Sequence, residues 1–563
     1  MHEYLETRRV RRINTGNALA ARRSPSLPSL VRGALMSVLP KPLFLLRTSW
    51  QTARMARRLQ RGHTAIAAQQ QTFKRLLEKI SGTVYGRDLG MHAGMSYADF
   101  KARVPIRDYQ QLTPYFDRIK RGEPHVLWPG ECPWQTHSAG TTNHPRWLPV
   151  TTDLLVHFEA AETAALMYHS IRVGHAGVFR GRHLSLERNP DLSPLATTKT
   201  GLTSPPLPIP ATVPQMPRWG APQLSEPGAL ISEMTDWPAK LDAISERTLR
   251  MDITLLSGLP HWLLVFVNAL RQRALAEELP VATLDAIWPN LECLMHHGVP
   301  IGPFHHELRR AAGTSVIFHE VYTAAEAFIA AQDVEAGSGL RLIEDAGVFF
   351  EFLPLDDYHE ALPLSLGAKA LSLEEVRPDQ DYVLLLTTPA GLCRYAVGDI
   401  VRFLSTEPPR LIMVGDTKLR LNAFAENVVE KDVTDAVVAV CDRHDWTITN
   451  FHVAPLFSSS LIGQTRGRHE WWVELKAGTT ETPTGPILAA EIDVELQERH
   501  ASYALKRQRG PLEAPVVRLV MPGFFAHWLQ QQGRWGGPHK MPRCGSDRAV
   551  AAEFSAIACF NAD

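Results

Sequence analysis

A run of small, hydroxylated and cationic residues lies between His137 and Thr151 and could bind phosphate. Gly140 allows a tight turn there, and Arg146 supplies a positive charge for an oxyanion. The run lacks the glycine spacing and terminal lysine of a Walker loop, so a plain surface turn that leads into a helix capped at Thr151 or Thr152 is the alternative. The hydroxyls that can contact phosphate belong to Ser138, Thr141 and Thr142.

The stretch Glu320–Glu326 places a carboxylate, a phenol and a hydroxyl within a few residues, directly after a predicted strand. The phenol is Tyr322 and the hydroxyl is Thr323. Glu326 could hold Mg²⁺, which takes oxygen ligands. The alternative is the exposed first turn of a helix, where acidic residues are common because they face the positive end of the helix dipole.

A second acidic residue, Asp399, ends a stretch that runs from a predicted strand at Thr387 through a turn. Because it follows Gly398, its carboxylate could accept hydrogen bonds from both hydroxyls of a ribose. The same residues are also compatible with an ordinary hairpin.

Two further stretches give weaker signals. The histidine pairs 296–297 and 305–306 lack a carboxylate or a third histidine at ligand spacing, so turn histidines are favoured over a metal site. The stretch Gly533–Arg543 is rich in glycine and carries three cations. Its Lys540 could make a mobile contact with an anion, although a solvated linker has the same composition.

The composition favours a small-molecule partner. The chain has 563 residues, 45% of them hydrophobic, so two or more domains are expected. Lys+Arg and Asp+Glu both total 59, which gives no electrostatic argument for a nucleic acid or an anionic membrane. The six cysteines form no CxxC pair, which argues against a zinc site or a disulfide framework. A cytoplasmic protein is therefore predicted.

The first 35 residues are strongly basic, with seven arginines against only Glu3 and Glu6. We expect residues 1–35 to form a disordered leader, and Met36 is an alternative start. The apolar piece Ala34–Leu46 is interrupted by prolines and is too short to span a bilayer.

Strand and helix patterns alternate along the rest of the chain after a proline-rich loop within residues 171–236, which predicts an α/β fold. The order restarts near Leu411, so we predict a large N-terminal domain over 36–410 and a small α/β domain over 411–563, hinged near residues 414–416. The expected strands are 253–256, 291–295, 315–318, 347–355, 382–387, 411–414, 447–454, 470–475 and 516–520, and the expected helices include 151–168, 260–275, 428–441 and 487–507.

The order of these stretches resembles that of the auxin-responsive acyl acid–amido synthetase family, a branch of the adenylate-forming enzymes related to acyl-CoA synthetases and luciferase. The resemblance runs from about Gln60 to the C-terminus. It implies a large, multi-layered adenylate-forming N-terminal domain with a smaller, mobile α/β C-terminal domain that acts as a lid. The segments that carry it are 104–109, 138–142, 288–290, 296–299, 322–326, 394–399 and 540–543.

The resemblance also implies a role for each candidate residue. Lys540 and Glu326 would be the catalytic residues. Lys540 would contact the reacting carboxylate and the α-phosphate, and Glu326 would bind Mg²⁺. Asp399 would bind the ribose, and residues 298–299 would border the adenine. The full set of residues implied for ATP binding is Ser138, Gly140, Thr141, Thr142, Arg146, Gly298, Val299, Tyr322, Thr323, Arg394 and Asp399.

The implied activity is that of an ATP- and Mg²⁺-dependent ligase. It would activate a carboxylic acid as acyl-AMP and pass the acyl group to an amine, such as an amino acid, to form an amide. Two alternatives stay open: an acyl-CoA or carrier-protein ligase, which shares the first step, and a degenerate adenylate-binding protein without turnover. The chain departs from the family pattern at Ala139, Arg146, His297 and Asp416.

Overall fold

The computed structural model describes most of residues 41–560. The ranges outside it are 1–40, 61–64, 139–145, 187–192, 195–224, 280–282, 359–361, 363, 425, 462–463, 477–482, 537–539 and 561–563. The predicted leader, most of the proline-rich loop and the tip of the predicted phosphate loop therefore lie outside the described residues.

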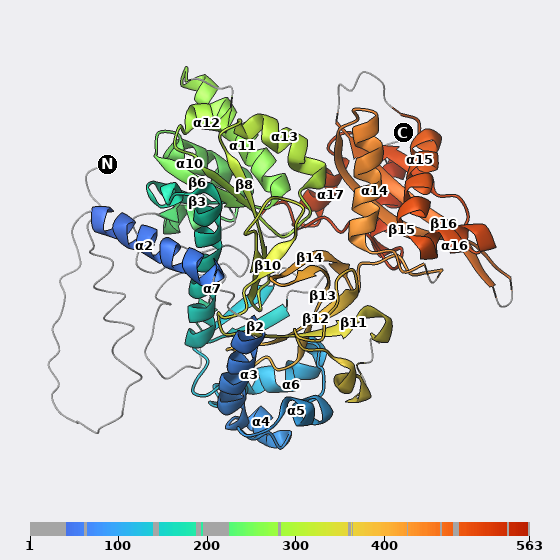
Figure 1. Cartoon of the computed structure of the whole chain (residues 1–563). Coiled ribbons are helices and arrows are strands. Elements are labelled where there is room, and N and C mark those ends of the chain that lie inside the picture. Colours follow the sequence, from blue (N-terminus) through green and yellow to red (C-terminus); the bar gives the residue numbers. More distant parts are fainter. Residues whose placement is uncertain are drawn as a thin grey trace.

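One eleven-stranded sheet forms the core of the molecule, in the order β11-β12-β13-β14-β10-β9-β8-β7-β6-β3-β5 (Figure 1). The strands β5, β3, β6, β7 and β8 are parallel, and from β8 to β11 all neighbours are antiparallel. The parallel strands are β3 (Arg182–Ser185), β5 (Ser225–Glu226), β6 (Ile253–Gly258), β7 (Cys293–His296) and β8 (Ile317–Thr323). The others are β9 (Phe328–Ala331), β10 (Leu340–Leu342), β11 (Phe349–Pro354), β12 (Asp381–Thr387), β13 (Tyr395–Thr406) and β14 (Pro409–Asp416).

Helices cover both faces of the parallel half. Successive residues of a strand point to opposite faces, so each strand contacts helices on both sides of the sheet. Leu255 packs against α7 (Thr152–Val173), whereas Leu256 packs in the cluster of the helices on the other face. Those helices are α10 (Trp237–Thr248), α11 (Pro260–Ala276) and α13 (Gly302–Ala312), with the short α9 (Ala229–Ser232) and α12 (Leu284–Ile287) beside them. The remaining N-terminal helices are α2 (Lys41–Gln60), α3 (Ala65–Ser81), α4 (Val84–Asp88), α5 (Tyr97–Arg103) and α6 (Tyr109–Lys120).

The predicted phosphate loop joins two strands and does not lead directly into a helix. β1 (Trp134–Ser138) pairs antiparallel with β2 (Arg146–Val150), and β4 (Ser193–Pro194) extends this small sheet. The helix that follows begins where predicted, since the side chain of Thr151 accepts a hydrogen bond from the Leu154 amide at 3.1 Å.

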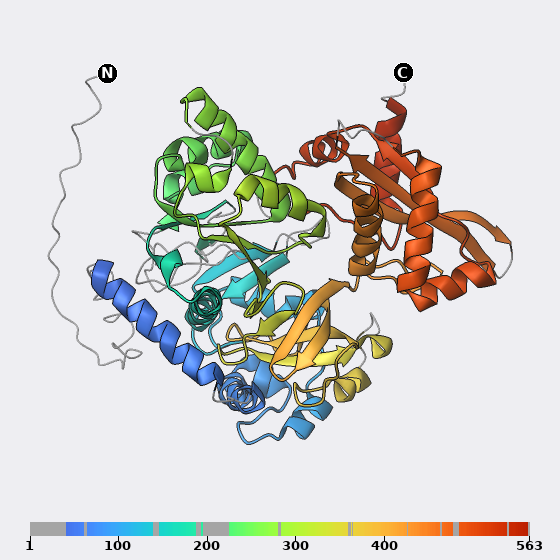
Figure 2. The same cartoon turned by 45° about the horizontal axis from the view of Figure 1, so that its top comes forward.

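The C-terminal part has its own sheet of β15 (Ile448–Leu461), β16 (Gln464–Leu475) and β17 (Val516–Val520), set beside the large sheet (Figure 2). Trp471 packs with α14 (Glu430–Arg443), α15 (Gly485–Arg499) and α16 (Ala501–Arg509) on one face. Trp472 packs with α17 (Phe524–Gln531) and α18 (Ala549–Phe560) on the other. The helix expected over 487–507 is divided, because α15 ends at Arg499 and His500 has extended backbone angles.

The strand expected over 411–414 lies in the large sheet and does not open the C-terminal domain. β14 pairs with β13 and β10, and its buried Leu411 and Val414 complete apolar clusters of the large domain. We therefore propose that the junction between the domains follows Asp416. No described helix is both long and apolar enough to cross a membrane.

Candidate active site

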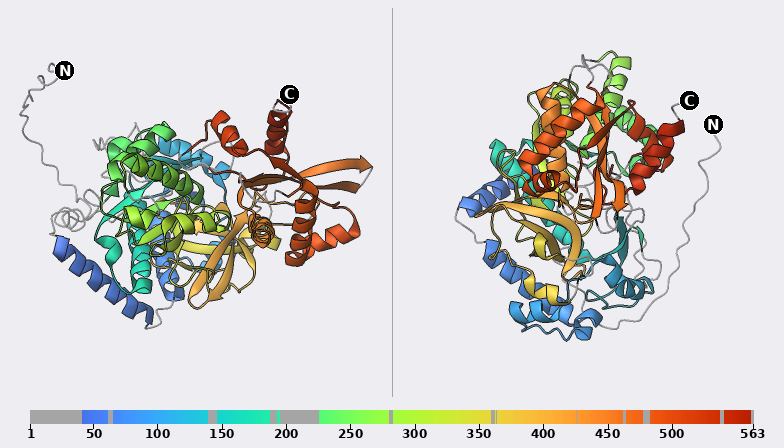
Figure 3. Two further views of the ribbon diagram at one scale, coloured as in Figure 1. Left: turned by 90° about the horizontal axis from the view of Figure 1, so that it is seen from above. Right: turned by 90° about the vertical axis from the view of Figure 1, so that its right-hand side faces the viewer.

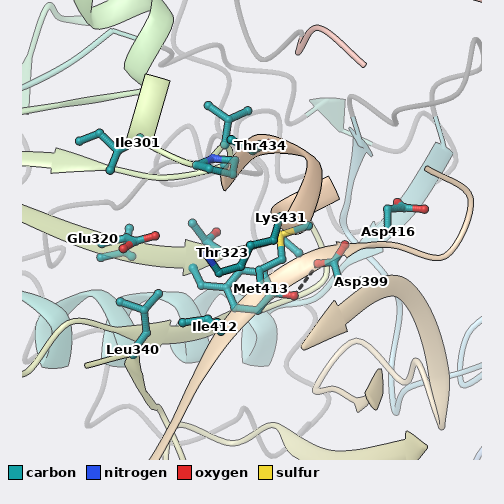
Figure 4. Close-up of a pocket in the computed structure, with 18 of the residues that line it drawn as sticks. Ile301, Glu320, Thr323, Leu340, Asp399, Ile412, Met413, Asp416, Lys431 and Thr434 are labelled. Carbon is teal, nitrogen blue, oxygen red and sulfur yellow. Dashed lines mark hydrogen bonds between the residues drawn. The ribbon is translucent and has the colours of Figure 1, made fainter. Parts of the chain in front are cut away.

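A cavity of about 440 Å³ opens where the sheet changes from parallel to antiparallel pairing. The carboxyl end of β8 lies at this switch, and such points are common ligand sites in α/β sheets. Residues of the C-terminal domain complete the wall, from α14 and from the loop that contains Lys540. In Figure 4, Asp399 and Asp416 lie toward one end of the pocket and Glu320 toward the other.

Two of the predicted residues meet directly in this pocket. The phenol of Tyr322 on β8 donates a 2.5 Å hydrogen bond to the carboxylate of Asp399 on β13. Burial raises the pKa of Asp399, and this hydrogen bond together with the charges of Lys540 and Arg146 partly offsets the effect. Asp399 therefore has one oxygen engaged by Tyr322 and is held at the pocket surface beside two cations.

Glu326 lies in the turn between β8 and β9, so the alternative that placed it in the first turn of a helix is wrong. It is buried against the pocket, where desolvation raises its pKa to about 7 and the nearby Arg146 opposes this effect. A cation would stabilise its charged form. Among the described residues no three metal-ligating side chains gather, but Mg²⁺ needs only one or two carboxylates when phosphate oxygens complete its shell. Glu326 fits such a site.

The raised pKa of Glu326 predicts a pH-dependent stability. Between its ordinary pKa of 4.5 and the folded value of about 7, the folded state binds more protons than the unfolded state, so this group stabilises the fold at low pH and the contribution is lost as pH rises toward 7. Glu326→Gln should remove this loss of stability. At pH 7.5 its free energy of unfolding should exceed that of the wild type by up to about 3 kcal/mol. Denaturant unfolding of both proteins from pH 5 to pH 7.5, without ligands, measures this difference. An equal pH dependence of the free energy of unfolding in the two proteins would contradict the raised pKa of Glu326.

Lys540 reaches the pocket from the C-terminal domain and lies against Gly298, which follows β7. A Cβ added at Gly298 would stand 3.5 Å from the Lys540 ammonium nitrogen and 2.4 Å from Leu259, and Gly298 has a φ of 81°. Glycine is therefore required here. Burial and the charge of Lys540 lower the pKa of His297 to about 3, so this neighbour is a neutral imidazole.

The predicted phosphate loop approaches the same pocket through its two strands. Ser138 pairs in register with Arg146, and Arg146 lines the pocket and donates to the Val397 carbonyl at 3.5 Å. Gly140, Thr141 and Thr142 lie outside the described residues. The predicted residues Val299 and Thr323 also line the pocket.

Arg394 does not belong to this site, although it was predicted to bind ATP. Its side chain is fully buried, and its guanidinium makes an ion pair with Glu351 at 3.0 Å. Its other hydrogen bonds go to the carbonyls of Lys101, Val104 and Gly367. With every nitrogen of the guanidinium engaged, Arg394 joins the N-terminal helices to the antiparallel half of the sheet and has no donor for a nucleotide.

Several pocket residues were not predicted from the sequence. Asp416 ends β14, and burial with the nearby Asp399 raises its pKa to about 6. Lys431 and Thr434 come from α14, and Glu320 and Gln332 come from β8 and the residue after β9. Two of them had a sequence signal: Asp416 is a departure from the pattern of the family that the chain resembles, and Glu320 opens the stretch that contains Glu326.

Comparisons with known proteins identify the family. Models of the GH3 family match as N-terminal domain over residues 57–202, central domain over 341–415 and C-terminal domain over 431–549. A probable indole-3-acetic acid-amido synthetase, GH3.12, of Oryza sativa subsp. japonica is 23% identical over 85% of this chain and 91% of its own length. The indole-3-acetic acid-amido synthetase GH3.15 of Arabidopsis thaliana is 23% identical over 84% of this chain and 89% of its own.

Solved structures show the same fold. The AtGH3.15 acyl acid amido synthetase in complex with 2,4-DB gives a TM-score of 0.69 at 17% identity and covers 90% of this chain and 96% of its own. The 2-hydroxyisobutyryl-CoA ligase in its postadenylation state gives 0.53 at 14% identity, over 96% of both chains. These neighbours confirm the predicted α/β fold with a large N-terminal and a smaller C-terminal domain. The chain therefore belongs to the GH3 family.

Proposed function

We propose that this chain is an ATP-dependent acyl acid–amido synthetase, which converts a carboxylic acid to acyl-AMP and transfers the acyl group to an amine such as an amino acid. One observation carries the proposal: Lys540 of the C-terminal domain lines the same pocket as Tyr322, Glu326 and Asp399 of the large domain. Transfer of the adenylyl group at the α-phosphorus needs cations beside the nucleotide, because they stabilise the negative charge of the reacting oxygens.

In the first step, an oxygen of the substrate carboxylate attacks the α-phosphorus of ATP, and the bond to the bridging oxygen breaks as pyrophosphate leaves. The Lys540 ammonium would lie beside the carboxylate and α-phosphate oxygens, where it offsets their mutual repulsion. Arg146 would supply a second cation from the hairpin. Mg²⁺, held by Glu326, would neutralise charge on the phosphates.

The hydrogen-bonded pair of Asp399 and Tyr322 would hold the nucleoside. One Asp399 oxygen accepts from Tyr322, which leaves its other oxygen to accept from the ribose hydroxyls. The Tyr322 ring would face the base beside the turn at Gly298. In this arrangement the phenol of Tyr322 positions the carboxylate by a hydrogen bond.

Asp399→Ala should raise the KM for ATP by about tenfold or more, because a hydrogen bond to a charged acceptor contributes roughly 1.5–3 kcal/mol. Initial rates against ATP concentration measure the change, with unfolding curves to show that the variant folds. Asp381→Ala is the matched control, since Asp381 lies in the same sheet paired with Arg402 and outside the pocket. An unchanged ATP dependence in a folded Asp399 variant would refute the ribose contact.

In the second step, the amine nitrogen attacks the acyl carbon, the bond to the AMP oxygen breaks, and a proton leaves the nitrogen as the amide forms. Activation is needed because a free carboxylate has no good leaving group. A thiol acceptor would follow the same path to a thioester, so the acceptor class decides between an amido synthetase and an acyl-CoA ligase.

The deciding experiment incubates the full-length protein with ATP, Mg²⁺ and a panel of aliphatic, aromatic and indolic acids, and measures exchange of labelled pyrophosphate into ATP. Mass analysis after addition of amino acids or CoA then identifies the product. Acid-dependent exchange with an amide product supports the proposal, and a thioester identifies a CoA ligase. Absence of exchange with every acid indicates a non-catalytic relative.

We also place the protein in the cytoplasm, in keeping with the unpaired cysteines 132, 293, 393, 441 and 544.

A further inference from the structure

The outer face of α2 presents large apolar side chains to solvent. The helix packs on the body through Leu45, Met55 and Leu59 of its inner face. On the outer face, Leu43 is 51% exposed, Leu46 is 68% exposed and Trp50 is 59% exposed. These three residues are separated by three and four positions, so they lie side by side on one face of the helix.

The same helix is strongly basic. Its 20 residues include Lys41 and four arginines and no acidic residue. Arg54 and Arg57 follow the apolar residues by helical spacing, and the Arg54 guanidinium lies 5.6 Å from the centre of the Trp50 ring. Arg58 makes a 2.6 Å ion pair with Asp345, which fixes the last turn to the large domain. The segment that precedes the helix adds seven arginines against two glutamates.

This combination differs from an ordinary surface helix. A helix that covers a core with one face normally carries polar residues on the other. Leucine and tryptophan flanked by arginine, without acids, are typical of helices that lie in the interface of an anionic bilayer. The eleven large apolar residues exposed in the described part of the chain include three within eight residues of α2, whereas the others are spread over five further helices, one strand and the residue that follows β17.

The position of α2 leaves the catalytic pocket free. The helix lies along the edge of the large domain that is remote from the C-terminal domain in Figures 1 and 2 and in the left view of Figure 3. A flat surface could therefore contact α2 without touching α14 or the Lys540 loop.

We propose that the outer face of α2, formed by Leu43, Leu46, Trp50, Arg54 and Arg57, docks the protein on the surface of an anionic lipid bilayer. The helix lies parallel to the surface, the apolar side chains enter the region between head groups and acyl chains, and the arginines pair with lipid phosphates. Charge complementarity selects this occupant, since a second copy of the same face would bring like charges together.

The test is flotation of the full-length protein with vesicles of phosphatidylcholine and with vesicles that also contain phosphatidylglycerol. Binding should require the anionic lipid and weaken as salt is added. Arg54→Gln/Arg57→Gln should weaken binding by roughly fivefold for each charge removed. Leu46→Ser/Trp50→Ser should weaken it by about tenfold or more, because the buried methylene groups are lost.

The matched control is Leu230→Ser, which removes an 85% exposed leucine from α9 and should bind as the wild type does. All variants should keep the wild-type unfolding midpoint, and their acid-dependent exchange without vesicles should be unchanged. Failure of the wild type to float with anionic vesicles overturns the proposal, whether or not the enzyme is active. Unchanged flotation of Leu46→Ser/Trp50→Ser overturns it too, as does a dimer in sedimentation that this variant abolishes, because a second copy would then cover the face.

Discussion

Lys540→Ala should lower acid-dependent pyrophosphate exchange by roughly 100- to 1,000-fold while ATP binding changes little. A single preorganised charge contact to a developing transition state contributes about 2.7–4 kcal/mol in a site that partly excludes water. Most nucleotide contacts would come from the large domain, through Asp399, Tyr322 and the turn at Gly298. Exchange rates and equilibrium ATP binding, measured on the same preparation, separate the two effects.

The second half-reaction provides a sharper test of Lys540. Synthetic acyl-AMP supplied with the amine bypasses adenylation, so the variant should then form amide at close to the wild-type rate. Equal losses in both steps would show that Lys540 is not specific to adenylation, and intact exchange would show that the family role does not apply. Lys506→Ala, on α16 of the same domain and outside the pocket, is the matched control.

Arg394→Met should lower the free energy of unfolding by about 3–5 kcal/mol, because it leaves the Glu351 carboxylate buried without its cation. The carbonyls of Lys101, Val104 and Gly367 lose their donors at the same time. Denaturant unfolding measures this loss, and the folded fraction of the variant should keep its affinity for ATP.

Arg402→Met provides the comparison for Arg394, since Arg402 lies on β13 and pairs with Asp381 in a partly exposed position. Its loss should cost less than about 1 kcal/mol, as is usual for solvated pairs. A stable Arg394 variant with weakened ATP binding would instead restore the role that its place in the sequence suggested.

The alternation of apolar runs predicted the parallel half of the fold well. The strand expected over 253–256 is β6, which runs to Gly258 and is buried at every position, and the helix over 260–275 is α11 within one residue. A strand of this kind is buried on both faces, so its composition alone marks it. The long hairpin of β15 and β16 was underestimated, because its outer part is rich in polar residues that give no continuous apolar signal.

Three candidates from the sequence line one pocket: Tyr322 near the end of β8, Glu326 in the turn that follows, and Asp399 within β13. Arg394 was assigned wrongly because neighbours in a motif need not point the same way. Its φ of 49° turns the backbone just before β13, and the side chain enters the core. Glu320 and Lys431 could not be found together, since only the packed fold brings β8 and α14 to one pocket.

The connection between the two domains is flanked on both sides by residues of the pocket wall. β14 ends at Asp416, α14 begins at Glu430, and both Asp416 and Lys431 line the cavity. A ligand in the cavity therefore contacts residues on each side of the junction. Its affinity must differ between any two orientations of the C-terminal domain that move these residues apart. By linkage, the occupied pocket shifts the balance of those orientations by the same coupling free energy.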